Sequence, residues 1–292
     1  MMFKKQALTA VGLLAAAASA LAGQSIGSVI PAGHVTFSDD SAEIFIDRDG
    51  NGTLDIGDSL RGILTINQIA GSGPATLIGG NTTYNELTGI FQTRVVGKTF
   101  VGVIGGIPRY DYQFEADPLF ATEFSLAAGT IGAFFEDSAN DFTRLGCVSV
   151  AACEATATGG SLWASFGLSG GFWAAATAAE QPNVGAVLPY NTVMGQFGIG
   201  MNFIVNNTGF QWNKVACLDP TNLLGPVQYV DFCGNGQILA TGNGLPNGVN
   251  TPYHLFDDVN FTANRVPEPA SIALVGLALA GMGAAARRSK KQ

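Results

Sequence analysis

The sequence predicts a mainly β protein with a single β-rich domain, of the sandwich or barrel-like type. Short apolar and β-branched runs alternate with Asn-Gly, Asp-Gly, Gly-Gly and Pro-containing breaks, as strands alternate with turns. Only 12% of the 292 residues are charged while 47% are hydrophobic, so the chain can bury a core. Its 39 glycines exceed the ordinary share of about 7% and follow no collagen period.

Six runs are predicted to be strands, and two segments depart from that pattern. Residues 174–180 are rich in Ala and are expected to form a short helix that ends before Pro182. Residues 234–252 collect Gly, Asn and Pro and are expected to form a loop. No linker cleanly divides residues 23–265, so we expect a single domain there. The predicted strands are 42–46, 60–66, 76–78, 89–96, 99–104 and 196–205.

The distribution of charge excludes nucleic acid as a partner. The chain holds 14 basic and 22 acidic residues, a formal net charge of −8. Six basic residues lie at the two ends, so residues 23–266 keep eight basic and 21 acidic residues, a net charge of −13. Nucleic acid and anionic lipid both require clustered cations, which this middle region lacks. The terminal cations are Lys4, Lys5, Arg287, Arg288, Lys290 and Lys291.

The first 22 residues have the three parts of a secretory signal peptide. Lys4 and Lys5 form the charged region, residues 7–21 are apolar, and Ala20-Leu21-Ala22 is an A-x-A cleavage site. We therefore expect residues 1–22 to be removed by a cut after Ala22. The alternative is an N-terminal membrane anchor, but about fifteen small apolar residues are short for a span.

The C-terminus combines a short motif, an apolar run and a basic cluster. Pro267-Glu268-Pro269 precedes the seventeen uncharged residues 270–286, and four cations follow at once. At 1.5 Å per residue this run is about 25 Å long, near the lower limit for a transmembrane helix. Cations at both termini should stay in the cytoplasm by the positive-inside rule. The acidic middle region is then expected on the far side of the membrane.

This arrangement resembles the PEP-CTERM sorting signal of Gram-negative bacterial surface proteins. The resemblance covers residues 266–291, and Pro267, Glu268 and Pro269 match the motif without departure. It implies an exosortase, a membrane-embedded cysteine protease that cuts near the motif, together with the secretion machinery. It also implies residence in the inner membrane before processing, then a cell-surface or secreted location, with exopolysaccharide as a further partner. The alternative is a plain C-terminal anchor with an accidental Pro-Glu-Pro.

Four cysteines in an exported chain predict disulfides, because thiols tend to oxidise beyond the inner membrane. Three pairings are open to Cys147, Cys153, Cys217 and Cys233. Short loop closure favours the local pairs Cys147–Cys153 and Cys217–Cys233. Zinc binding is the alternative, but the chain has no C-x-x-C pair and its two histidines lie far away in sequence.

One segment of the middle region, residues 47–58, has the spacing of a twelve-residue calcium loop. Acidic and amide side chains occupy positions 1, 3, 5, 9 and 12, Gly52 occupies position 6, where the chain turns sharply, and Leu54 is expected to anchor the loop in the core. The usual EF-hand has Glu at position 12, and the shorter Asp58 should lower affinity. Sites of about 10⁻⁴–10⁻³ M suffice outside the cell. The candidate ligands are Asp47, Asp49, Asn51, the backbone carbonyl of Thr53, Asp55 and Asp58.

The loop resembles the EF-hand-like loops of dockerins, which also accept Asp at the last position. Dockerins carry two such loops, whereas this chain carries one. The flanking residues, with Ile44, Phe45 and Ile46 before the loop, suit strands better than EF-hand helices. The alternative is an exposed hairpin turn, since Asp-Gly and Asn-Gly are ordinary turn pairs.

Signals of catalysis are weak, and we expect no enzymatic activity. Residues 167–171 satisfy G-x-S-x-G, but the segment is Gly/Ser-rich and lacks the strand–turn–helix context of a nucleophile elbow. Asp111, Glu115 and Asp117 have a spacing that does not define a glycosidase pair. The sequence thus indicates an exported, calcium-stabilised structural protein linked with exopolysaccharide or biofilm. The alternatives are a carbohydrate-binding surface protein and a secreted hydrolase.

Overall fold

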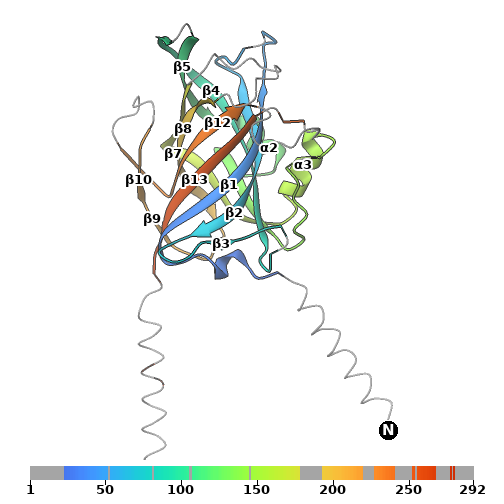
Figure 1. Ribbon diagram of the computed structural model, residues 1–292, viewed down its shortest axis with the longest axis vertical. Helices are drawn as coiled ribbons and strands as arrows, with labels where there is room; N and C mark the ends of the chain where they lie inside the picture. The colour runs from blue at the N-terminus through green and yellow to red at the C-terminus, as the bar shows by residue number, and fades with distance from the viewer. Residues whose placement is uncertain are drawn as a thin grey trace, which may run out of the picture.

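Eight strand positions form an antiparallel sheet that closes on itself (Figure 1). The computed structural model describes residues 23–267 except 52, 81, 105–106, 145, 178–192, 220–226, 241–251 and 254, together with 277 and 279. The order around the sheet is β2, β1, β13, β12, β8, β7, β5 with β6, and β4, which pairs back to β2. These strands are β1 (Gly33–Ile46), β2 (Ser59–Ala70), β4 (Glu86–Ile104), β5 (Ile107–Ala116), β6 (Thr130–Asp137), β7 (Ser161–Thr177), β8 (Val193–Asn206), β12 (Phe232–Ala240) and β13 (Leu255–Arg265).

One strand position is shared by two strands that lie end to end. The long strand β4 pairs with β6 near its start and with β5 over its second half, and β7 does the same on the other side. Helix α2 (Pro118–Glu123) lies in the connection between β5 and β6. The smaller elements are the 3-10 turn η1 (Ile26–Ser28), β3 (Thr76–Leu77), β9 (Trp212–Asn213), the ribbon of β10 (Val215–Cys217) with β11 (Gln228–Val230), and helix α3 (Val150–Ala157).

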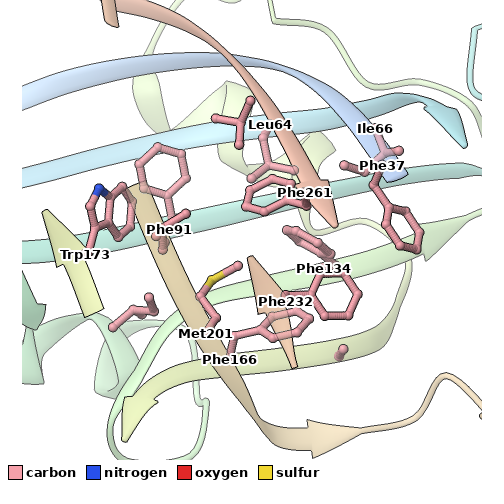
Figure 2. Packing of buried hydrophobic residues seen from close by; sticks show 14 of the residues in the cluster. Phe37, Leu64, Ile66, Phe91, Phe134, Phe166, Trp173, Met201, Phe232 and Phe261 are labelled. Carbon is pink, nitrogen blue, oxygen red and sulfur yellow. The ribbon is translucent and has the colours of Figure 1, made fainter. Parts of the chain in front are cut away.

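The interior is filled by side chains from every second strand position, many of them aromatic (Figure 2). The ring centroids of Phe166 and Phe232 are 4.9 Å apart, and those of Phe37 and Phe232 are 5.3 Å apart. Strand glycines give these rings room. A Cβ at Gly62 would lie 2.4 Å from the Phe91 ring, and one at Gly89 would lie 2.7 Å from that of Phe134. The high glycine content therefore has a packing cause as well as a turn cause.

A second apolar cluster lies outside the sheet, where α2 and α3 cover β1, β2 and β4. Its fully buried members include Phe120 of α2 and Cys153 of α3, packed with Ile63 and Ile90. Both favoured disulfides are present. Cys147–Cys153 joins α3 to the preceding loop with a Cα–Cα distance of 5.5 Å, and Cys217–Cys233 joins β10 to β12 at 5.4 Å.

The mainly β, barrel-like fold is confirmed, and the six predicted strands fall in β1, β2, β3, β4 and β8. Two local expectations are wrong over the residues that the structure describes, while residues 178–180 and 241–251 of the same two segments lie outside the described residues. Residues 174–177 belong to strand β7 instead of a helix, because Ala174 and Ala175 pair with Gly198 and Phe197 of β8. Residues 234–240 belong to β12 instead of a loop. Pairing with distant strands outweighed the local propensity of alanine and glycine in both places.

Candidate functional site

The calcium-type loop connects β1 to β2 and is fixed against strand β4. The strand flanks expected from the sequence are present, since β1 ends at Ile46 and β2 begins at Ser59. Backbone hydrogen bonds join Gly57 N–H to Val95 C=O at 2.9 Å and Val95 N–H to Asp58 C=O at 2.8 Å. Leu54 is buried in the main core, as the sequence predicts. The loop is therefore anchored at its apolar and C-terminal residues.

Three of the predicted ligands converge. One carboxylate oxygen from each of Asp47, Asp49 and Asp58 lies within 4.8 Å of the others. Asp58 is buried, and its two oxygens accept hydrogen bonds from the N–H groups of Arg48 at 2.8 Å and Asp55 at 2.7 Å. Asp47 accepts from the Gly50 N–H at 2.7 Å. Backbone donors thus orient two of these carboxylates toward a common point.

The next two candidate calcium ligands, Asn51 and Thr53, form hydrogen bonds mainly with other residues of the loop. The Asn51 side-chain oxygen accepts from the Thr53 N–H at 2.7 Å and from the Thr53 hydroxyl at 2.6 Å. The Asn51 amide nitrogen donates to Asp49 at 2.8 Å and to Asp55 at 3.0 Å. If the Asn51 amide group is rotated by 180°, its oxygen, the atom that could bind a metal ion, faces the carboxylates of Asp49 and Asp55 in place of its nitrogen. For Thr53, the described contacts involve its N–H and hydroxyl groups.

Asp55 lies outside the converging group because it pairs with a cation from another strand. Lys98 of β4 donates to the Asp55 carboxylate at 2.5 Å and to the Leu54 carbonyl at 2.9 Å. The hydrogen bond from Lys98, followed by that from Thr53, lowers the pKa of Asp55 to about 2. The Lys98 ammonium also lies 4.9 Å from the ring centroid of Tyr110. The sequence spacing did not reveal this ion pair.

The cation inside the loop, Arg48, points away from the converging acids. Its guanidinium donates to Asp117 at 2.6 Å and to the Ser59 hydroxyl at 3.1 Å. Calcium prefers six to eight oxygen ligands and tolerates irregular geometry. Asp47, Asp49 and Asp58 fit the acidic part of such a set.

Sequence reasoning missed a second acidic group, formed by Glu86, Asp137 and Asp141. Glu86 is buried and accepts from the Phe142 N–H at 3.1 Å. Burial first, with the charges of Asp137 and Asp141, raises the pKa of Glu86 to about 7. These residues come from the start of β4, the end of β6 and the loop after it, so no spacing in the sequence brings them together.

The weak catalytic signals do not form a site among the described residues. Ser169 lies within β7, where the pairing with β8 shifts register between Gly167 and Phe172, so the strand–turn–helix context is absent there. Asp117 is buried and accepts from Arg48, Ser59, Gln92 and the Leu119 N–H. Both oxygens of Asp117 thus accept hydrogen bonds within the fold.

The sorting segment begins where the barrel-like sheet ends. Arg265 is the last residue of β13, and it pairs across to Trp212 of β9. Its guanidinium lies 3.7 Å from the ring centroid of Phe210 and donates to the Ile30 carbonyl. The Val266 N–H donates to the Gln211 carbonyl at 2.8 Å, and Pro267 is exposed. The chain is therefore fixed by strand pairing up to the residues that directly precede the Pro-Glu-Pro motif.

Several predictions fall on residues that are not described. The signal peptide 1–22, Glu268, Pro269 and the span 270–286, apart from Leu277 and Leu279, lie outside the described residues. Within the part of the chain that the structure describes, no helix has both the length and the apolar character needed to cross a membrane.

Comparison with protein families finds the sorting segment. Residues 265–289 match the family described as PEP-CTERM protein-sorting motif. Comparison of the chain with curated proteins and with solved structures found no significant match. The chain thus carries a PEP-CTERM sorting motif, which implies processing by an exosortase at the membrane. The motif indicates export, followed by a surface or secreted location.

Proposed function

We propose that this protein is a structural component of the cell surface or extracellular matrix, associated with exopolysaccharide and biofilm and without enzymatic activity. The observation that carries the proposal is the sorting motif at residues 265–289, placed directly after the last strand of a disulfide-bonded domain. Exosortase substrates of this kind are typically linked with exopolysaccharide production. The acidic charge of residues 23–266 suits a hydrated, neutral matrix better than nucleic acid.

The packing inside the sheet supports a structural role. A cavity lined by Asp39, Ser41, Trp173 and Asp257 among others has a volume of about 30 Å³. That is room for a water molecule, whereas small-molecule sites usually measure about 300–1,000 Å³. Aromatic rings fill the interior around it. A domain built in this way gains stability from its interior and presents its outer surface to partners.

We propose further that calcium stabilises the 47–58 loop. Asp47, Asp49 and Asp58 would hold the ion, with Asn51, Thr53 and Asp55 completing the oxygen set. The ion would balance the charge of acids that the Arg48 guanidinium, which is directed at Asp117, does not neutralise. Binding to the folded state alone raises stability by mass action.

The sorting part of the proposal is tested by intact mass and cell fractionation. The wild-type protein should lose both its signal peptide and its C-terminal tail. Glu268→Gln, or deletion of residues 267–292, should leave a different mature mass and alter the location of the protein. Glu115→Gln, which makes the same change at an exposed residue of β5, should be processed as wild type. Identical mass and location for all variants would contradict the proposal.

The calcium part is tested by thermal unfolding of the exported protein in chelator and in 5 mM calcium. For a dissociation constant of about 10⁻⁴–10⁻³ M, calcium should raise the midpoint by about 2–8 °C. Asp49→Asn should abolish the rise. Asp137→Asn changes the other acidic group and should preserve it. A rise that Asp137→Asn removes and Asp49→Asn preserves, or no rise at all, would assign the loop to turn chemistry alone.

One observation favours the carbohydrate-binding alternative. The hairpin of β4 and β5 carries the exposed Phe100, whose ring centroid lies 5.6 Å from that of Tyr110. Exposed aromatic rings offer flat apolar faces on which sugar rings can stack. Retention of the exported protein on the producing cell's polysaccharide, with loss of retention in Phe100→Ala, would favour this function over a purely structural one.

A further inference from the structure

The interior contains three carboxyl groups that neither the sorting motif nor the calcium loop uses. Asp39 and Glu43 of β1 and Asp257 of β13 are all at least 95% buried. Glu43 pairs with Leu255 across the two strands, so Asp257, two residues further along β13, faces the same side of the sheet. The Asp39 carboxylate accepts a hydrogen bond from the Val259 N–H at 2.7 Å. The interior therefore holds acidic groups surrounded by aromatic side chains.

Glu43 and Asp257 lie within hydrogen-bonding range of each other. Neither oxygen of Glu43 has a hydrogen-bond donor among the described residues, and the same holds for one oxygen of Asp257. Two ionised carboxylates have no hydrogen to donate, so a bond between them requires a proton. Without that proton, two buried negative charges would face each other in an apolar interior, which is a costly arrangement.

No described cation enters this part of the interior. The strands β2, β4, β7 and β8 present apolar side chains to the adjoining cavity. Arg144 is the nearest cation. It pairs with the outward-facing Asp40 at 3.5 Å, and its guanidinium lies 5.7 Å from the Phe256 ring centroid. Asp40 and Asp258 add negative charge from the same two strands. Every titratable neighbour except Arg144 thus favours the protonated pair.

A metal ion fits these residues less well than a proton does. The oxygens of Asp39, Glu43 and Asp257 do not all come within 4.8 Å of one another, whereas those of Asp47, Asp49 and Asp58 do. The cavity beside them, lined also by the Ser41 hydroxyl, has a volume of about 30 Å³. That volume admits a water molecule that could hydrogen-bond to Ser41 and Asp39.

We infer that Glu43 and Asp257 form a proton-binding site inside the barrel-like sheet, and that this site makes the exported protein more stable in mildly acidic surroundings than in alkaline ones. The folded protein holds the shared proton, whereas the unfolded chain releases it near the ordinary carboxyl pKa of about 4. Burial raises the pKa of Asp257 to about 7 and raises that of Glu43 well above its usual value. Stability is therefore full below about pH 4 and falls as pH rises through 7.

Thermal unfolding between pH 5 and pH 8 tests this inference. A chelator is present so that calcium binding to the 47–58 loop does not contribute to stability. The wild-type midpoint should be lower at pH 8 than at pH 5 by at least about 5 °C. In Glu43→Gln the side-chain amide donates to Asp257 without titrating. We expect its midpoint to fall by less than half as much, and to exceed the wild-type midpoint at pH 8. Equal pH dependence in wild type and Glu43→Gln would overturn the inference.

Two comparisons separate the titration of Glu43 and Asp257 from that of other carboxyl groups. Glu115→Gln removes an exposed carboxyl from β5 and should keep the wild-type dependence on pH. Glu86 also has a raised pKa and titrates in the same direction, so the decisive quantity is the difference between wild type and Glu43→Gln.

Infrared spectroscopy gives a reading that does not depend on the stability of a variant. The wild-type protein at pH 7 should show the carbonyl band of an un-ionised carboxylic acid, shifted on exchange into deuterated water. Absence of that band would overturn the inference even where Glu43→Gln fails to fold.

Discussion

Two groups of carboxylates, all of them buried except the exposed Glu123, lie on opposite faces of the same wall of the sheet. The outer group consists of Asp117, Glu123 and Glu154 and lies where α2 and α3 cover the strands. Its carboxylates form ion pairs with two arginines, Arg48 and Arg61. The inner group, Asp39, Glu43 and Asp257, faces the aromatic interior without a cation among the described residues. Asp117 and Asp39 have the same exposed fraction, 2%.

The comparison shows that hydrogen-bond donors and a nearby cation can together outweigh the effect of burial on the pKa of a carboxyl group. Burial alone would raise the pKa of Asp117, but hydrogen bonds from Ser59, Gln92 and the Leu119 N–H, with the charge of Arg48, lower it. Burial raises the pKa of Asp39, and the charge of Asp257 adds to the rise. Asp117 and Glu123 of the outer group, whose pKa values are lowered, therefore stabilise the fold as anions, whereas the inner group does so as acids.

Removal of the Arg61 guanidinium from the outer group should lower the free energy of unfolding more than any other change proposed here. Arg61 donates to Glu154 at 2.6 and 2.7 Å and to Glu123 at 2.8 Å, and its guanidinium lies 5.2 Å from the ring centroid of Phe124. Arg61→Met keeps the apolar stem but leaves the buried Glu154 without its partner. We expect the free energy of unfolding, measured by urea denaturation at pH 7, to fall by about 3–5 kcal/mol.

The matched control for this change is Arg94→Met on β4. The Arg94 guanidinium makes no ion pair in the described part of the chain, so the loss should stay within about 0.5 kcal/mol. Similar losses for the two variants would mean that the outer group contributes no specific stability, and the contrast with the inner group would disappear.

Removal of one outer charge should have a smaller effect that depends on pH. Asp117→Asn keeps the shape of the side chain but weakens its four hydrogen bonds, so we expect a loss of about 1–3 kcal/mol at pH 7. The pKa of Asp117 is lowered in the folded state. Its contribution is therefore present above the ordinary value of 3.8 and is lost as the pH falls below that value.

Denaturation of Asp117→Asn at several pH values sharpens the comparison. The difference from wild type should shrink below about pH 4, opposite to the behaviour expected of Glu43→Gln, which differs from wild type at alkaline pH. A constant difference at every pH would show that the loss comes from packing and leave the pKa argument for the outer group without support.

The sequence revealed the loop acids because their spacing is local. Asp47 and Asp49 are two residues apart in the sequence. The glycines that favour the turn between them and Asp58 lie within the same twelve residues. The pairing of Asp55 with Lys98 spans 43 residues and depends on the register of β4 against the loop. The group of Glu86, Asp137 and Asp141 likewise depends on how β4 meets β6. No periodicity within a segment carries that information.

The sequence by itself determined the mainly β class, the flanks of the loop and the sorting motif, and it favoured the disulfide pairs that form, because each of these features depends on residues that are close along the chain. Only the tertiary structure decided that the sheet closes between β2 and β4, that residues 174–177 extend a strand, and that Glu43 meets Asp257. These outcomes depend on contacts between segments that are far apart in the chain, in the case of β1 and β13 by more than two hundred residues. Such contacts form where burial of many side chains together outweighs the preference of any one segment.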